Sequence, residues 1–204
     1  MRRTREQAAE TNRQILQAAE ELFLEKGYDN VSLEEIAVQA GVSRGAVHWH
    51  FKNKQGLLRA LRGMAQEPFR KLEEELAVSD GLTSLRKLIG AIGDFFKRLE
   101  NDPRQQGLIR AMMRLDLAVA ENENNTEPAT FPEEMQEIFM RIFQVVDRDL
   151  GMIPPWNPEK AATMLNATVG GTIMEWGFKR GQFHLSEDGI LVVRTLLQGL
   201  IRTL

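Results

Sequence analysis

The sequence predicts an all-α protein in two parts: an N-terminal three-helix domain built around a helix-turn-helix (residues 1–53) and a C-terminal helical domain (residues 54–204). Apolar residues recur at three- and four-residue steps along most of the 204 residues, and no segment shows the alternation of a strand. Clusters rich in glycine, proline and asparagine separate these runs. Near the start of the chain, two short runs flank a single glycine, which is the spacing of a helix-turn-helix.

The first predicted helix runs from about Thr11 to Lys26, and Gly27 ends it. Its apolar stripe consists of Ile15, Leu16, Ala19, Leu22 and Phe23. The leading MRRTR is expected to form an arm, either a solubilising tail or a contact to the DNA minor groove or phosphates.

Two short helices and a tight turn are predicted from Ser32 to Lys54 (SLEEIAVQAGVSRGAVHWHFKNK). Ser32 and Glu35 have the spacing of a capping box, which begins a helix. Gly41 supplies the left-handed residue that ends this helix. Ser43 then caps the second helix, RGAVHWHF.

The outer face of the second helix indicates DNA recognition. A structural helix of this length commonly exposes Glu, Lys and Gln, whereas this one presents Arg, Gly and His-Trp-His. Arg44 in the first turn is expected to read a guanine through O6 and N7. Trp49, His50 and Lys54 are expected to hold the DNA backbone. The alternative is an aromatic patch buried against a neighbouring domain. The predicted DNA-binding residues are Ser32, Ser43, Arg44, Gly45, His48, Trp49, His50, Lys52 and Lys54.

At these residues the chain resembles the TetR family of transcriptional regulators. The family ends its recognition helix with Tyr, any residue, His and Phe, followed by Lys, and this chain has HWHFKNK at 48–54. Leu22, Phe23, Gly27 and Tyr28 stand where the family has its LF…KGY signature, and the resemblance covers about residues 8 to 62. His48 replaces the family's Tyr, which contacts the DNA backbone or a thymine methyl, so the role of His48 is open.

The run GTIMEW at 171–176 is similar to the AcrR-type branch, which represses multidrug efflux pumps. This resemblance implies a repressor that binds double-stranded operator DNA of palindromic sequence and is released by a small hydrophobic or cationic effector. It also implies that the last two helices pair with their mates in a four-helix bundle, and that an effector pocket lies between the helices before them.

The distribution of charge agrees with specific DNA binding. Residues 1–62 carry ten Lys/Arg and eight Asp/Glu, a net charge of +2, whereas the remainder carries −5 and the whole chain −3. A modest basic footprint on an acidic body suits a protein that finds a particular site, because it does not coat nucleic acid indiscriminately.

A long helix is expected from Lys54 towards Leu76. Pro68 lies inside it and removes a backbone hydrogen bond, so we expect a bend near Gln66–Phe69. The alternative is a helix that ends there and restarts. Further helices are predicted at about 82–100, 104–120 and 132–150, with a polar loop at 121–132.

The last two predicted helices start at Pro158, capped by Asn157, and at Ser186. They are small or apolar on most sides, and one body of this size cannot hide so much apolar surface. A homodimer through these two helices is therefore expected.

The preceding helices are rich in Phe and Met, which pack around varied apolar ligands. An acidic residue among them would select cationic amphiphiles. The alternative is that the Phe and Met residues are ordinary core, and that the charged residues face solvent or form salt bridges at the surface. The predicted ligand-binding residues are Phe95, Phe96, Met112, Met113, Asp116, Phe139, Phe143, Glu175 and Trp176.

Other functions receive little support from the sequence. The chain has no cysteine, and its three histidines, His48, His50 and His184, are not spaced as metal ligands. No nucleophile stands beside a base in a known motif. We therefore expect no enzyme activity, cofactor or metal. The polar start predicts neither a signal peptide nor membrane association, hence a cytoplasmic protein. Two alternatives stay open: a helical carrier or interaction module without specific DNA binding, and a TetR-like regulator of metabolic genes.

Overall fold

In the computed structural model, the described residues are 5–103, 105–109, 112–113, 130–179 and 182–201. They are almost entirely helical, and this part of the chain holds only an isolated bridge between Met152 and Ile201 in place of any strand. The all-α prediction is confirmed. The chain divides into two compact units: residues 1–65 with 102–126 form unit 1, and residues 66–101 with 127–204 form unit 2.

Unit 1 contains α1 (Arg5–Lys26), a 3-10 turn (Tyr28–Asn30), α2 (Leu33–Gln39), α3 (Arg44–Phe51) and the first half of α4 (Lys54–Glu74). Helix α1 begins at Arg5, six residues before the predicted start at Thr11. The Thr11 hydroxyl donates to the Gln7 carbonyl at 2.9 Å, so Thr11 lies within the helix. The early turns are rich in Glu, Gln and Ala, which favour helix without an apolar stripe. Of the expected arm, residues 1–4 lie outside the described residues.

The caps of the helix-turn-helix form as predicted. The Glu35 amide donates to the Ser32 hydroxyl at 3.2 Å, and the Ser32 amide donates to the Glu35 carboxylate at 2.9 Å. Gly41 has φ of 65°, the left-handed conformation that ends α2. The Ser43 hydroxyl accepts from the Ala46 amide at 3.2 Å and begins α3. The local sequence therefore fixes the turn between α2 and α3.

Unit 1 extends beyond the predicted boundary at residue 53. Leu57, Leu58 and Leu61 of α4 are buried and belong to unit 1. A second addition comes from the segment after residue 102: a Cβ at Gly107 would lie 3.1 Å from the Leu24 Cα of α1, so the two backbones pack closely. The three-helix domain is thus completed by parts of the chain that the motif does not include.

Helix α4 is one continuous helix through Pro68, so the alternative in which it ends and restarts is wrong. Proline has no N–H, and its ring interrupts the hydrogen bonding of the preceding turn. The division between the two units falls between Ala65 and Gln66, within that turn. Pro68 therefore removes a backbone hydrogen bond from α4 close to the junction of the units.

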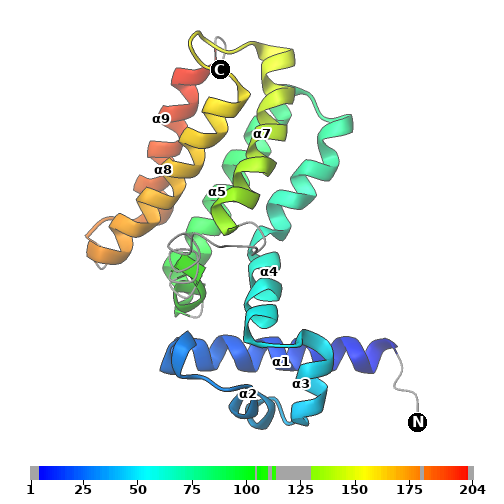
Figure 1. Cartoon of the computed structure of the whole chain (residues 1–204). Helices are drawn as coiled ribbons and strands as arrows, with labels where there is room; N and C mark the ends of the chain where they lie inside the picture. The colour runs from blue at the N-terminus through cyan, green and yellow to red at the C-terminus, as the bar shows by residue number, and fades with distance from the viewer. Residues whose placement is uncertain (1–4, 104, 110–111, 114–129, 180–181, 202–204) are drawn as a thin grey trace, which may run out of the picture. The chain divides into compact units, whose positions relative to one another are not determined.

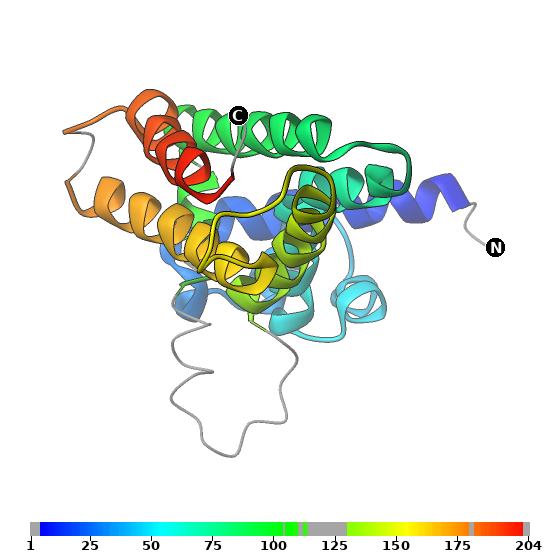
Figure 2. The same ribbon diagram turned by 90° about the horizontal axis from the view of Figure 1, so that it is seen from above.

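Unit 2 is a group of long helices: α5 (Gly81–Asn101), α7 (Phe131–Leu150), α8 (Pro158–Lys179) and α9 (Ile190–Leu200). The second half of α4 and a 3-10 turn (Glu75–Val78) precede them. Helix α7 packs between α5 and α8, and α9 lies against α5 and α8, as Figures 1 and 2 show. Two predicted helices, 82–100 and 132–150, are confirmed. Of the one predicted at 104–120, residues 105–109 and 112–113 are helical and the others lie outside the described residues.

The helix starts of unit 2 match the prediction at Asn157 but not at Ser186. The Asn157 side chain accepts from the Lys160 amide at 2.8 Å and caps α8. A π-helical turn (Leu185–Gly189) precedes α9, and both the amide and the hydroxyl of Ser186 donate to Glu100 of α5. Ser186 therefore does not cap the last helix, because its side chain serves a carboxylate from a distant helix.

Large apolar side chains are exposed on α8 and α9 in the single chain. They are Met164, Met174, Leu191 and Val192. Val193, Leu197 and Leu200 on another face of α9 are buried within unit 2. The four exposed side chains are thus not part of the core of unit 2. Within the described part of the chain, none of the helices is sufficiently long and apolar to span a membrane.

Candidate nucleic-acid interface

Helix α3 separates a buried side from an exposed side, as its sequence predicts. Val47 and Phe51 are buried and anchor the helix, whereas Arg44, Gly45 and His48 are exposed. The buried pair fixes the rotation of the helix about its axis, because neither side chain can leave the core without loss of apolar burial. The exposed residues therefore have a defined direction and form one surface.

Trp49 is 74% exposed, an unusual state for the residue type with the largest apolar area. Its ring makes an edge contact with the His50 ring, with 4.6 Å between the ring centroids. The predicted alternative of an aromatic patch buried against a neighbouring domain does not describe Trp49 in this chain. An exposed indole stabilised by a neighbouring ring offers an apolar face to a partner.

Arg44 is paired with an acidic residue of α2. One guanidinium nitrogen, Nη1, lies 2.8 Å from Oε1 of Glu34, and both side chains are largely exposed. Glu34 is the second residue of α2 and Arg44 the first residue of α3, so the turn between the helices brings them together. The sequence does not mark Glu34 as a partner of Arg44, since the two lie ten positions apart and their contact depends on the angle between the helices.

A groove of about 690 Å³ lies between the start of α1 and the end of α3. Its walls are Ala8, Ala9, Asn12, Arg13, Trp49 and His50. The wall from α1 was also missed by the sequence analysis, because only the packing of the folded helices brings Arg13 beside Trp49. The guanidinium of Arg13 pairs with Glu10 one turn earlier, and both are exposed. The lining of the groove thus combines the apolar side chains of Ala8, Ala9 and Trp49 with the cation of Arg13.

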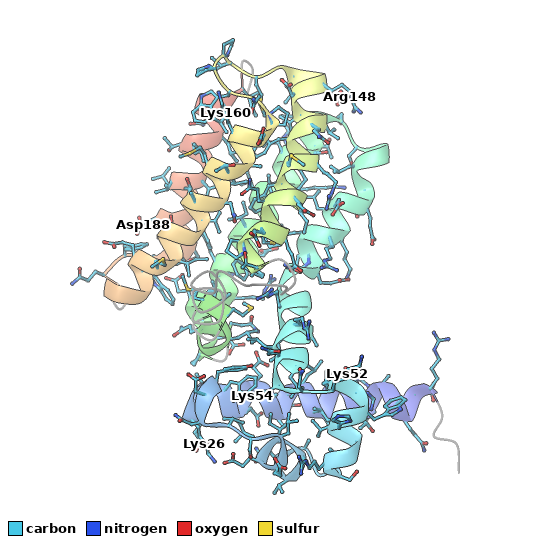
Figure 3. All side chains as sticks on the ribbon, in the orientation of Figure 1. Lys26, Lys52, Lys54, Arg148, Lys160 and Asp188 are labelled. Atoms are coloured by element: carbon cyan, nitrogen blue, oxygen red, sulfur yellow. The ribbon has the colours of Figure 1, made fainter. Side chains whose placement is uncertain are left out.

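Lys52 and Lys54, both labelled in Figure 3, have different surroundings although only Asn53 lies between them. Lys52 is exposed and ends α3 with φ of 61°. The ammonium of Lys54 donates to the carbonyls of Tyr28 at 2.7 Å, Val31 at 3.1 Å and Asp29 at 3.3 Å. It also lies 4.4 Å from the centroid of the Tyr28 ring. An ammonium has three donors, so Lys54 holds the α1–α2 connection and has none left for a phosphate.

The predicted serines are also engaged within the protein. The hydroxyls of Ser32 and Ser43 serve as helix caps, so each already accepts a backbone hydrogen bond. The Ser32 hydroxyl donates as well, to Glu35 at 2.9 Å. Both serines stand at helix starts, where unpaired backbone amides and the helix dipole favour a phosphate.

Glu35 of α2 contacts both the last residue of α1, Lys26, and the residue that caps α2, Ser32. Its carboxylate accepts from the Lys26 ammonium at 2.8 Å, and from the amide and hydroxyl of Ser32. The hydrogen bond from Lys26, followed by those from Ser32, lowers the pKa of Glu35 to about 2. In turn, the hydrogen bond to Glu35 and its negative charge raise the pKa of Lys26. The end of α1 and the start of α2 are therefore joined by a charged contact.

In unit 2, all four predicted phenylalanines are buried. Phe95 and Phe96 of α5 and Phe139 and Phe143 of α7 are buried in the core. Phe69 of α4, which the prediction omitted, makes edge contacts with Phe95 at 6.1 Å and with Phe139 at 5.9 Å between centroids. The helical spacing of apolar residues on α4 predicts its buried face, but it does not indicate that Phe69 contacts Phe95 and Phe139.

The remaining predicted ligand-binding residues are not part of this aromatic cluster as far as it is described. Glu175 is exposed and Trp176 half-buried, both on α8. Met112 is buried and Met113 half-buried, and their segment is assigned to unit 1. Asp116 lies outside the described residues.

Unit 2 also has a charged cleft of about 450 Å³ between α4 and α7. Its lining includes Arg70, Glu73, Glu74, Glu134, Glu137, Ile138 and Arg141. Several of these groups interact with one another or with Gln66: Arg141 pairs with Glu73, and Glu134 accepts from the Gln66 amide at 2.6 Å. This cleft was not predicted, because its two walls are distant in sequence.

Comparison with known proteins identifies related regulators. The model of the family described as "Bacterial regulatory proteins, tetR family" matches residues 15–61. The chain is 32% identical over 201 residues to the HTH-type transcriptional repressor BepR of Brucella suis biovar 1, covering 98% of this chain and 96% of BepR. It is 44% identical over 194 residues to the HTH-type transcriptional regulator TtgR of Pseudomonas putida, covering 86% and 84%.

Two solved structures have the same fold. NalD, described as the secondary repressor of the MexAB-OprM multidrug efflux pump in Pseudomonas aeruginosa, has a TM-score of 0.72 and 30% identity, with 97% of this chain and 100% of NalD covered. The SmeT–triclosan complex has a TM-score of 0.75 and 28% identity, with 95% and 92% covered. SmeT is described as the repressor of the Stenotrophomonas maltophilia multidrug efflux pump SmeDEF.

Proposed function

The chain belongs to the TetR family of bacterial regulatory proteins, and from this we propose that it is a ligand-responsive repressor of a multidrug efflux system. The observation that carries the proposal is the surface of α3, where Arg44, Gly45 and His48 are exposed beside an exposed Trp49 over a buried Val47 and Phe51. The efflux part of the proposal comes from NalD and SmeT, which are described as repressors of multidrug efflux pumps.

Each subunit places α3 in the major groove of its operator half-site. Arg44 reads a guanine, because a guanidinium at the first turn reaches O6 and N7. Trp49, His50 and Lys52 contact the backbone, and the groove between α1 and α3 takes one strand. In that groove the sugars lie on the apolar wall and Arg13 pairs with a phosphate. Lys54 acts indirectly, by holding the connection between α1 and α2.

The protein acts as a homodimer through α8 and α9. Met164, Met174, Leu191 and Val192 are exposed on these helices in the single chain and supply apolar surface for a two-fold contact. A two-fold dimer requires a pseudo-palindromic operator with half-sites about 10 bp apart, or a multiple of that.

A small hydrophobic or cationic effector binds unit 2 and releases the DNA. The aromatic cluster of α4, α5 and α7 is the apolar environment for such a ligand. Bound effector favours a conformation in which the two recognition helices no longer match the groove spacing. For hundredfold release, the effector must bind that conformation about 2.7 kcal/mol better than the DNA-binding one.

The experiment that tests the proposal is a selection of random DNA duplexes by the purified protein near physiological salt. Recovery of a palindromic motif is expected, and the same selection with Arg44→Ala should lose it. A wild-type protein that recovers no motif, yet binds hydrophobic compounds tightly, would refute the proposal in favour of a helical carrier. The recovered motif can then be searched for upstream of pump genes, and its release can be titrated with pump substrates.

A further inference from the structure

The pair formed by Glu34 and Arg44 has little to offer the stability of the fold. Both side chains are more than half exposed, and surface ion pairs of this kind contribute little because water screens them and ordering two long side chains costs entropy. The fold in this region is already fixed by the Ser32 and Ser43 caps and by the buried Val47. The ion pair itself therefore contributes little to folding, and the charge of Glu34 acts on the fold mainly through the dipole of α2, in whose first turn it lies.

A carboxylate at this position weakens binding to DNA in general. Glu34 stands in the first turn of α2, next to the residue that reads the base, and DNA carries a dense row of negative phosphates. Repulsion between like charges opposes every complex, with operator and with random sequence alike. This repulsion lowers the affinity for operator and for random DNA alike. Glu34 can offset the loss at the operator only if it strengthens a contact that is made there.

The geometry of the guanidinium supplies that advantage. Arginine has five N–H donors, and Glu34 engages Nη1 at 2.8 Å, which leaves donors on the other nitrogens. A two-bond contact with guanine O6 and N7 requires the guanidinium to be held in the plane of the base. A side chain already held at one nitrogen loses less conformational freedom when it binds.

We propose that Glu34 is a positioning residue that holds Arg44 ready for guanine and thereby sets the ratio of operator affinity to random-DNA affinity, while its charge weakens binding to both. The inference rests on the proposed function, because it requires Arg44 to read a base. Glu34 acts through Arg44 and by its charge, and needs no contact with a base itself.

The test is a set of binding titrations with the motif recovered by selection and with a scrambled duplex of the same composition. The proteins are the wild type, Glu34→Gln, Arg44→Ala and the double variant, with Glu25→Gln as the control. Glu25 is also an exposed glutamate of unit 1, but it lies at the end of α1, whereas Arg44 pairs with Glu34. Thermal unfolding of each variant checks that the fold is unchanged.

Glu34→Gln should bind the scrambled duplex more tightly than the wild type, and its operator-to-scrambled ratio should fall by about fivefold, the upper range for an exposed ion pair. Replacement of the contacted guanine by 7-deazaguanine, which lacks N7, should reduce wild-type binding more than that of Glu34→Gln. In the Arg44→Ala background, Glu34→Gln should leave the ratio unchanged, because the residue it positions is absent. Glu25→Gln should leave the ratio unchanged as well.

A wild-type motif combined with an unchanged ratio in Glu34→Gln would overturn this inference and leave the proposed function standing. The same holds if Glu34→Gln lowers the ratio equally with and without Arg44. Failure of the wild type to select any motif would overturn the proposed function, and the role of Glu34 with it.

Discussion

Replacement of Lys54 by methionine should destabilise unit 1 while leaving the exposed surface of α3 in place. Methionine keeps an unbranched stem of similar length but removes the ammonium that donates to the carbonyls of Tyr28, Asp29 and Val31. The change also removes the cation from the face of the Tyr28 ring. The segment that these contacts hold is the connection from α1 to α2, which has only a short 3-10 turn of its own.

The size of the effect follows from these contacts. A hydrogen bond from a charged group contributes about 1.5–3 kcal/mol, and the contacts at 2.7 and 3.1 Å are short enough to count fully. Partial access of water to the carbonyls reduces the sum, whereas the cation–π contact adds about 0.5–1 kcal/mol. We expect the free energy of unfolding to fall by about 2–4 kcal/mol. With a slope of about 2 kcal/mol/M in urea, the unfolding midpoint should fall by about 1–2 M.

The assay is urea unfolding followed by far-UV circular dichroism, with operator binding measured separately at low urea. Lys52→Ala is the matched control, since Lys52 is exposed and next to the same junction. It should unfold as the wild type does but bind all DNA more weakly, with a reduced dependence on salt. The reasoning would be refuted if Lys54→Met kept its midpoint and lost DNA affinity in the manner of Lys52→Ala.

Three further predictions concern the reading surface, the dimer and acid stability. Arg44→Ala should cost about 1–3 kcal/mol on the operator with little loss on random DNA, measured by fluorescence anisotropy; equal losses on both would end its base-reading role. Leu191→Glu should convert the proposed dimer to a monomer in analytical ultracentrifugation and weaken operator binding, while an unchanged mass would show that the interface does not use this face of α9. Hydrogen bonds from Lys26 and Ser32 lower the pKa of Glu35 in the folded protein from its ordinary 4.5 to about 2. The ionised carboxylate therefore stabilises the fold fully above about pH 4.5, and this stabilisation disappears as the pH falls towards 2. The free energy of unfolding of Glu35→Gln, measured as the pH is lowered, should therefore fall less steeply than that of the wild type. Two curves that coincide at every pH would contradict the prediction.

Features that depend on nearby residues were predictable from the sequence. The caps at Ser32, Ser43 and Asn157 and the left-handed Gly41 all arise from contacts within about four residues, so the residue types and their spacing suffice. The start of α1 was missed because its first turns are polar, and helix-forming residues without an apolar stripe leave no periodic signal.

Contacts between distant segments were not predictable in the same way. Lys54 appeared to be a phosphate contact because the start of a helix commonly binds anions, yet tertiary folding brings three carbonyls to its ammonium. Ser186 had the residue type of a cap, but Glu100, 86 residues earlier, is its partner. The contact of Glu34 with Arg44 depends likewise on how α2 and α3 cross.

The composition of unit 1 limits how this protein can be re-engineered as a biosensor. A chimaera that joins residues 1–53 to the sensor of another regulator would discard Leu57, Leu58 and Leu61, which are core residues of unit 1. It would also discard the helical segment at Gly107, which packs on Leu24 of α1. The transplantable DNA reader is therefore discontinuous in sequence. A successful exchange must carry α4 to about Ala65 and a compatible 102–113 segment, or supply new side chains that cover both exposed surfaces.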